Sequence, residues 1–418
     1  MNKKHLNDHK TSFRLFVYVW LMYAVVYMTK NCFSGAMASI VAEGIMTKSQ
    51  TGLITALFYL AYAPLQIVGG RLADRWRPDM LIIIGLLGAA TANLIIYINQ
   101  NYYLMLVVWT LNACLQFALW PAIFKIVSSQ LAHEHRIRGV YYITFASTFG
   151  LCLTFILSAV MRRWQDNFLL SAILLFIFAI GFLIIYPHAE KKMVPDDGIP
   201  AKPIHGDVEI DETLDTSSKT MFKKCGLYLF VTVTVIRGLI ELGLKNIAPT
   251  LLMESYDEIS PAIGNMLNII IILSGLVGMF TAKAVYPRRI PDIIKGMRLF
   301  TFLMLPMLLF TMLVGKINVV FIIISLSLTI AMAAASGLFA QYYSMRFAKY
   351  GKNGEVAGIV NAGAALGIVI QSYGIALVAD LWNWTVVMGL LAVLCVIALI
   401  LIAMIYPKWK KFTREYDI

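Results

Sequence analysis

The sequence predicts an all-α polytopic membrane protein whose twelve transmembrane helices form two six-helix halves. Of the 418 residues, 60% are hydrophobic and only 14% are charged, whereas soluble domains carry about 45–50% apolar and about 25% charged residues. Apolar runs of about 20 residues, long enough to cross a bilayer as helices, recur along the whole chain. A single long polar stretch near the middle divides these runs into two equal sets. A soluble globular protein is therefore excluded.

The six apolar runs of the first half are expected at 14–38, 50–70, 79–98, 103–130, 137–160 and 167–187. The six of the second half are expected at 224–253, 261–283, 293–314, 317–346, 355–379 and 384–406. Residues 188–223 hold three prolines and an acidic cluster, and such a composition does not bury a core. We therefore expect an N-terminal half over 1–187, a linker over 188–223 and a C-terminal half over 224–418.

The distribution of basic residues predicts the orientation in the membrane. With a cytoplasmic N-terminus, the tails, linker and loops on that face hold 27 Lys and Arg, against 4 on the opposite face. Cytoplasmic loops carry an excess of Lys and Arg, so both termini and the linker are expected on the cytoplasmic side. The membrane is expected to be a bacterial inner membrane. The net charge of +12 then reflects topology and contact with membrane lipids, and no nucleic-acid partner is expected.

The loop after the second span reads GRLADRWRP over residues 70–78. It is similar to the signature G-x-L-A-D-R-x-G-R of the major facilitator superfamily, with Arg77 in place of the usual glycine. Asp74 and Arg75 can form charge pairs at a helix end, Gly70 permits close helix approach, and Arg71 adds a cation. We expect these four residues to form a cytoplasmic gate; the alternative is a basic loop that only anchors topology.

Ionisable residues inside the membrane are candidates for function, because burying a charge there costs several kcal/mol on insertion scales. Five stand out: Lys30, Lys125, Arg237, Glu241 and Lys245. The last three are spaced i, i+4, i+8 and share one helix face. Two flanking cations favour the ionised form of the carboxylate, which makes it a poor proton carrier. Alternatives are snorkelling for Lys125 and a purely structural ladder for the other three.

Aromatic and amide side chains accompany these charges. Tyr23 and Tyr27 share a face with Lys30 in the first span. The fourth span presents a stripe at i, i+4, i+8, and the eleventh span adds one amide; these residues are Asn112, Gln116, Trp120 and Asn361. Amides in hydrocarbon face a cavity or bond another helix, and both alternatives remain open. All are carried as candidate substrate-binding residues, and no metal ligand set or cofactor is expected.

Three stretches resemble the organophosphate:phosphate antiporter family, which includes glycerol-3-phosphate and hexose-phosphate transporters. Residues 23–33 (YAVVYMTKNCF) are similar to Y-A-x-Y-Y-x-x-R-K-N-F, and residues 74–78 (DRWRP) to D-R-x-x-P. Residues 116–125 (QFALWPAIFK) are similar to Q-x-x-G-W-P-P-x-x-R, with Arg138 and a glycine following as in the family. The resemblance covers the N-terminal half well and the C-terminal half only sparsely.

The resemblance implies that substrate phosphate is held by one arginine from the first span and another from the seventh. Here the first position carries Lys30, which keeps the charge and loses the bidentate fork. The second falls on Glu241, with Arg237 one turn away. The family's histidine in the fifth span corresponds to Ser147. Phosphate ester transport is thus an expectation that the departures from the family's residues call into question.

These features favour secondary transport by alternating access, with a small, polar, anionic solute such as a phosphate ester or carboxylate as the expected substrate. All six histidines lie in tails or loops, so no histidine proton relay is expected and exchange against a second anion fits better. Alternatives are transport of a zwitterion whose ammonium pairs with Glu241, and a transporter-like ligand sensor. No catalytic motif is present, so an enzyme is not expected; a monomer is.

Overall fold

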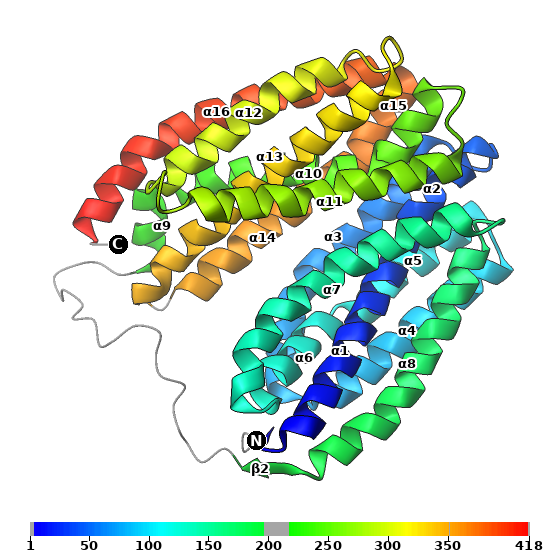
Figure 1. The fold of residues 1–418 in the computed structure, drawn as a ribbon, viewed down its shortest axis with the longest axis vertical. Helices are drawn as coiled ribbons and strands as arrows, with labels where there is room; N and C mark the ends of the chain where they lie inside the picture. Colours follow the sequence, from blue (N-terminus) through cyan, green and yellow to red (C-terminus); the bar gives the residue numbers. More distant parts are fainter. Residues whose placement is uncertain (1–3, 196–216, 351, 417–418) are drawn as a thin grey trace. The chain divides into compact units, whose positions relative to one another are not determined.

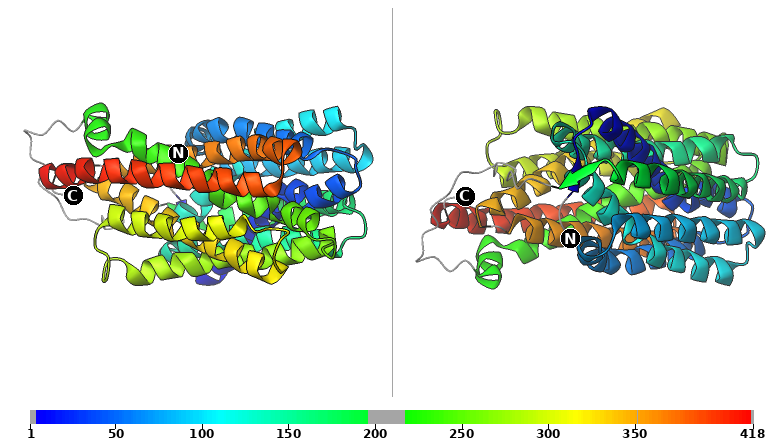
Figure 2. Two further views of the ribbon diagram at one scale, coloured as in Figure 1. Left: turned by 90° about the horizontal axis from the view of Figure 1, so that it is seen from above. Right: turned by 90° about the horizontal axis from the view of Figure 1, so that it is seen from below.

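The computed structural model describes residues 4–195, 217–350 and 352–416, and the described part is almost entirely helical. The chain forms two compact units, residues 1–201 and 202–418. In each unit long helices lie side by side as a bundle (Figures 1 and 2). The central part of the expected linker, 196–216, lies outside the described residues.

The first unit contains β1 (Lys4–Leu6), α1 (His9–Lys30), α2 (Cys32–Ala42), α3 (Lys48–Arg75), α4 (Pro78–Ile98), α5 (Tyr102–Gln116), α6 (Leu119–Lys125), the π-helical turn η1 (Ile126–Gln130), α7 (His133–Val160), α8 (Asp166–Glu190) and β2 (Met193–Pro195). The two short strands pair in antiparallel fashion, with Leu6 opposite Met193. Leu6 is fully buried and joins the core of this unit. The start of α1 is thereby fastened to the segment that follows α8.

The second unit contains α9 (Ser218–Cys225), α10 (Leu227–Ser255), α11 (Pro261–Val285), α12 (Ile293–Thr311), α13 (Val319–Met345), the 3-10 turn η2 (Arg346–Tyr350), α14 (Asn353–Ile370), the π-helical turn η3 (Gln371–Ile375), α15 (Ala376–Leu381) and α16 (Trp384–Glu415). The helix α16 continues past the expected end at 406. The expected end marked where the apolar run stops, and the helix goes on through a basic segment that the hydropathy pattern does not register.

Ten helices of the described part are long and apolar enough to cross a membrane. The helices α3 and α7, with 28 residues each, are also long enough, since 28 residues rise about 42 Å. In α7 residues 145–160 form a continuous apolar run. Together these helices agree with the predicted twelve spans, and the prediction of an all-α membrane protein is confirmed.

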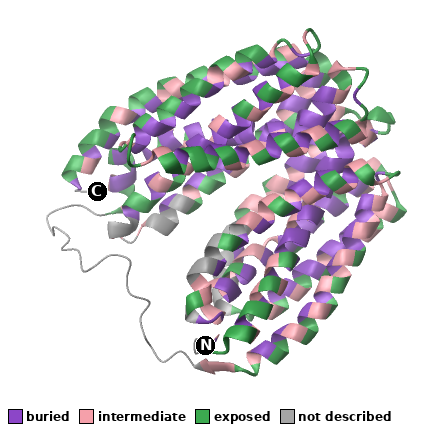
Figure 3. Ribbon diagram, viewed as in Figure 1, coloured by how far each residue is buried: buried purple, intermediate pink, exposed green. Residues whose placement is uncertain are grey.

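Buried and exposed positions alternate around the helices of each bundle (Figure 3). Large apolar side chains such as Ile98, Ile177 and Ile184 are more than half exposed. A monomeric soluble protein rarely exposes apolar patches of this extent, whereas lipid tails cover them at no cost. Glycines allow close packing inside the bundles: a Cβ on Gly238 of α10 would overlap the backbone of α14.

Candidate functional site

The first predicted site residue, Lys30, lies where the first membrane span is broken. The helix α1 ends at Lys30, Asn31 is not helical, and α2 begins at Cys32. The Asn31 side chain donates a hydrogen bond to the carbonyl oxygen of Tyr27 (2.7 Å), which caps this break. Transporter binding sites are commonly built at such interrupted helices. The break thus places a cation at a position suited to ligand binding.

Aromatic rings surround the ammonium group of Lys30. Its Nζ lies 3.6 Å from the ring centre of Tyr62, 5.4 Å from that of Tyr59, 5.7 Å from that of Tyr27 and 5.8 Å from that of Phe58. We call these four rings the aromatic box. Each desolvated cation–π contact contributes up to about 2 kcal/mol. Among the described residues no acidic side chain pairs with Lys30, and the contacts of its ammonium group in that part of the chain are with aromatic rings.

The aromatic box rests on the core of the first unit and continues along α1. Phe58 is buried and its ring lies 5.6 Å from that of Trp109 on α5. The ring of Tyr27 lies 5.9 Å from that of Tyr23, and Tyr23 lies 4.9 Å from Trp120 on α6. The structure therefore joins four of the predicted residues, from Trp120 through the two α1 tyrosines to Lys30, in one aromatic wall.

The amides of the fourth span face the interior of the first unit. Asn112 and Gln116 are 0% and 1% exposed, and Gln116 donates a hydrogen bond to the side-chain oxygen of Asn112 (2.6 Å). Two non-helical residues then separate Gln116 from α6. Lys125 ends α6 and is half-buried, while Asn361 is exposed on α14. These residues remain predictions as substrate ligands.

In the second unit, Arg237, Glu241 and Lys245 lie along one face of α10 as the spacing predicts. We call them the charge ladder. One carboxylate oxygen of Glu241 accepts a hydrogen bond from Arg237, and the other accepts one from Lys245 (2.9 Å). The three side chains are only 16%, 9% and 12% exposed. The ladder is thus a nearly buried group with a net charge of +1.

Glycines on neighbouring helices make room for the two cations of the charge ladder. A Cβ on Gly337 of α13 would lie 2.7 Å from Nη1 of Arg237, and one on Gly275 of α11 would lie 3.5 Å from Nζ of Lys245. The side-chain amide of Asn268 on α11 donates to the carbonyl oxygen of Lys245 (2.8 Å). The charge ladder therefore packs between α10, α11 and α13.

The predicted gate residues Gly70, Arg71, Asp74 and Arg75 lie in the last turns of α3, and their side chains are outside the described part. The side chain of Arg138, in α7, is also outside it. Beside the gate residues Arg77, the departure from the signature, is described. Its guanidinium donates hydrogen bonds to Asp79 (2.9 and 3.1 Å) and to Glu190 at the end of α8 (3.1 Å).

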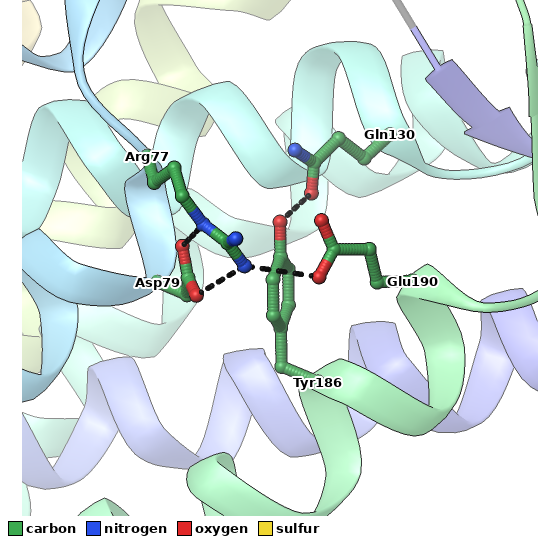
Figure 4. A network of polar contacts seen from close by, with 5 residues as sticks. All are labelled: Arg77, Asp79, Gln130, Tyr186 and Glu190. Carbon is green, nitrogen blue, oxygen red and sulfur yellow. Dashed lines mark hydrogen bonds and ion pairs between the residues drawn. The ribbon is translucent and has the colours of Figure 1, made fainter.

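Figure 4 shows Arg77 between these two carboxylates, with Tyr186 alongside donating to Gln130 of η1 (3.1 Å). The hydrogen bonds to Asp79, and then the charges of both carboxylates, raise the pKa of Arg77. Since Arg77 is half exposed, each pair contributes at most about 1 kcal/mol. The network ties the α3–α4 turn to α8, and it has no obvious ligand role.

Sequence reasoning missed the three residues of α3 that form most of the aromatic box. Phe58, Tyr59 and Tyr62 are spaced i, i+1 and i+4, so Tyr62 lies about one helical turn from both of the others. The available signal was this group of three aromatic residues in a span expected to be plain hydrocarbon. It did not reveal its partner, because the contact with Lys30 joins two different helices.

Comparison with curated proteins finds relatives that match parts of this chain. It is 33% identical over 98 residues to "Membrane sensor protein UhpC" of Escherichia coli (strain K12), covering 23% of this chain and 22% of that protein. It is 23% identical over 215 residues to a "Probable hexose phosphate transport protein" of Chlamydia trachomatis, covering 48% and 46%. The matched segments thus span less than half of each relative's length.

Solved structures of similar fold cover nearly the whole chain. The nucleoside transporter NupG matches with a TM-score of 0.72 at 12% identity, covering 93% of this chain and 100% of that one. A bacterial homologue of the human lysosomal transporter Spinster matches with a TM-score of 0.71 at 13% identity, covering 97% and 99%. Residues 19–370 match the family described as the Major Facilitator Superfamily. The chain therefore belongs to the Major Facilitator Superfamily.

Proposed function

We propose that this protein is a secondary transporter that moves a small organic anion of the phosphate ester or carboxylate class by alternating access, with Lys30 as the residue that binds the anion. The observation that carries the proposal is the environment of Lys30: a cation at a helix break, held by the aromatic box and paired with no acidic residue among those described. An incoming anion is its natural counter-ion. Similarity to probable hexose phosphate transport proteins supports the phosphate ester class.

The same proposal assigns the neighbouring aromatic residues and the buried cations of the second unit to substrate binding. Tyr23, Tyr27 and Trp120 offer ring faces and polar edges to an organic group. Arg237 and Lys245 offer further positive charge. With one fixed carboxylate between two cations the charge ladder keeps a net charge of +1, and we infer exchange of one anion for another as the mode of transport. We also infer a bacterial inner membrane with both termini cytoplasmic, a monomer, and a gate at residues 70–75.

Uptake by purified protein reconstituted into liposomes tests the role of Lys30. We expect Lys30→Ala to abolish exchange of radiolabelled phosphate esters, and Lys30→Arg to retain it, because guanidinium also binds phosphate and stacks on aromatic rings. Lys316→Ala, in an exposed loop, is the matched control and should transport normally. Unchanged transport by Lys30→Ala, with a normal melting temperature, would refute the assignment.

A second candidate function is ligand sensing without transport. It is favoured by the similarity to the membrane sensor protein UhpC over 98 residues in Escherichia coli and 122 residues in Salmonella typhimurium. A sensor would shift its melting temperature with the ligand, since binding to the folded state stabilises it, yet would show no exchange in liposomes. Exchange of ligand in liposomes that is lost in Lys30→Ala would favour transport over sensing.

A zwitterionic substrate is the remaining alternative, with Glu241 receiving an ammonium group. Both oxygens of this carboxylate are already engaged by cations, so such a substrate would have to displace at least one of them. A thermal-shift comparison of phosphate esters, carboxylates and amino acids separates the classes. Shifts with amino acids alone, lost in Glu241→Gln, would favour the zwitterion.

A further inference from the structure

The outer surface of the second unit carries a groove between α12 and α16, with a volume of about 640 Å³. We call it the lipid groove. Two cations, Lys295 and Arg298, stand at one end of it. Leu299 and Phe302 of α12 continue its wall, and the facing wall comes from apolar residues of α16, including Ile400. The groove therefore combines a basic end with an apolar length.

The position of the lipid groove along the helices matches the boundary of the bilayer. Lys295 and Arg298 are the third and sixth residues of α12, within about 8 Å of its beginning at 1.5 Å per residue. Phe302 lies about 10 Å further along the helix axis than Lys295. Tyr406 on the opposite wall lies beside the cations, and tyrosine is enriched where hydrocarbon meets the headgroups. The basic end is thus at headgroup level.

The two cations are available to a ligand. Both are exposed, and neither forms an ion pair with any described acidic residue. The Nζ of Lys295 lies 5.8 Å from the ring centre of Tyr406. The nearest carboxylate in sequence is Asp292, which caps α12 by accepting a hydrogen bond from the Lys295 backbone N–H (3.0 Å). Asp292 thus caps the helix, and no ion pair joins it to the side chain of Lys295 or Arg298.

The apolar wall is exposed as well. Phe302 is 58% exposed and Ile400 56%, and Leu299 is 40% exposed. In a bilayer these surfaces meet lipid tails. A soluble anion satisfies only the basic end, and a neutral lipid only the apolar length. One molecule that satisfies both is an amphiphile with an anionic phosphate and an acyl chain.

We propose that the lipid groove binds one anionic phospholipid. Its phosphate accepts hydrogen bonds from Arg298, whose planar fork suits phosphate oxygens, and from Lys295. One acyl chain lies along Leu299, Phe302 and Ile400. Since α12 and α16 supply opposite walls, the bound lipid bridges two helices that already pack together, and it stabilises the folded second unit.

Melting of the purified full-length protein in neutral detergent tests the proposal. We expect dioleoylphosphatidylglycerol to raise the melting temperature, and dioleoylphosphatidylcholine to raise it much less. Glycerol phosphate, which has the charge without the chain, should not reproduce the shift that depends on the lipid groove. The double variant K295Q/R298Q should bind phosphatidylglycerol at least about tenfold more weakly, because two charge-assisted hydrogen bonds are lost.

The matched control is R288Q/R289Q, which removes the same charge from the exposed α11–α12 loop outside the groove. It should keep the phosphatidylglycerol shift. Ala403→Trp, which fills the apolar wall, should lose the shift while keeping both cations. Equal shifts with the two lipids, an equal loss in the control, or full binding by K295Q/R298Q would each overturn the proposal. A shift with glycerol phosphate that K295Q/R298Q abolishes would replace the lipid by a soluble anion in the groove, whereas a shift that the double variant keeps belongs to the site at Lys30.

Discussion

Replacing Glu241 by glutamine perturbs the charge ladder with almost no change in shape. The substitution leaves Arg237 and Lys245 close together with no neutralising carboxylate. At 2.9 Å and an effective dielectric constant of about 20, the Lys245–Glu241 attraction alone is about 6 kcal/mol before desolvation. After relaxation, breaking a buried pair by removing one partner costs about 3–5 kcal/mol. We expect a cost in this range, because all three side chains are more than four-fifths buried.

The expected result is a melting temperature lower by on the order of 10 °C, for a unit of about 200 residues. An added anion should then restore part of the loss, because Arg237 and Lys245 gain a substitute partner. Phosphate at ten times its dissociation constant would return about 1.4 kcal/mol. The assay is thermal unfolding of the purified protein with phosphate or with chloride at equal ionic strength.

Glu258→Gln, in an exposed turn after α10, is the matched control and should melt like the unmodified protein. A Glu241→Gln protein that melts within about one degree of the unmodified protein would refute the reasoning, since the two cations would then need no carboxylate. Destabilisation without any rescue by phosphate would show instead that the ladder is structural and is closed to anions.

Three further predictions follow from particular contacts. Tyr62→Leu should weaken anion uptake in liposomes, whereas Tyr62→Phe should retain it, because phenyl keeps the ring face that Lys30 contacts. Gly278→Ala should cost about 1–3 kcal/mol in thermal unfolding, because its methyl would overlap the carbonyl oxygen of Ala331; Gly358→Ala, with open space around it, should not destabilise. Arg77→Gln should lower stability in thermal unfolding by no more than about 2 kcal/mol, since its guanidinium is half exposed and each of its two ion pairs contributes at most about 1 kcal/mol.

The spans and the charge ladder could be predicted from sequence because both are patterns within one segment. A long run of apolar residues predicts a helix that spans the bilayer. The i, i+4, i+8 spacing of Arg237, Glu241 and Lys245 places them on one helix face, independently of the neighbouring helices. The helix break at Asn31 left no comparable signal, since neither proline nor glycine marks it. Its amide instead bonds back to the preceding turn.

The aromatic box could not be predicted, because it depends on how α1 and α3 approach each other. Nothing in the sequence tells which face of α3 meets Lys30, and Phe58, Tyr59 and Tyr62 look like ordinary membrane aromatics. The lipid groove could not be predicted either. In the sequence, Lys295 and Arg298 count only among the basic residues that indicate the cytoplasmic face, and it is the packing of α12 on α16 that places them beside an apolar wall.

The pairing of β1 with β2 brings the segment before α1 and the segment after α8 into direct contact. Residues Lys4–Leu6 and Met193–Pro195 are hydrogen-bonded neighbours, although almost 190 positions of chain separate them. A unit whose two end segments are adjacent tolerates circular permutation or insertion into another protein, because a short linker can join those segments. Separate expression of residues 1–201 and 202–418 is accordingly a sound starting point for building split or rearranged versions of this protein.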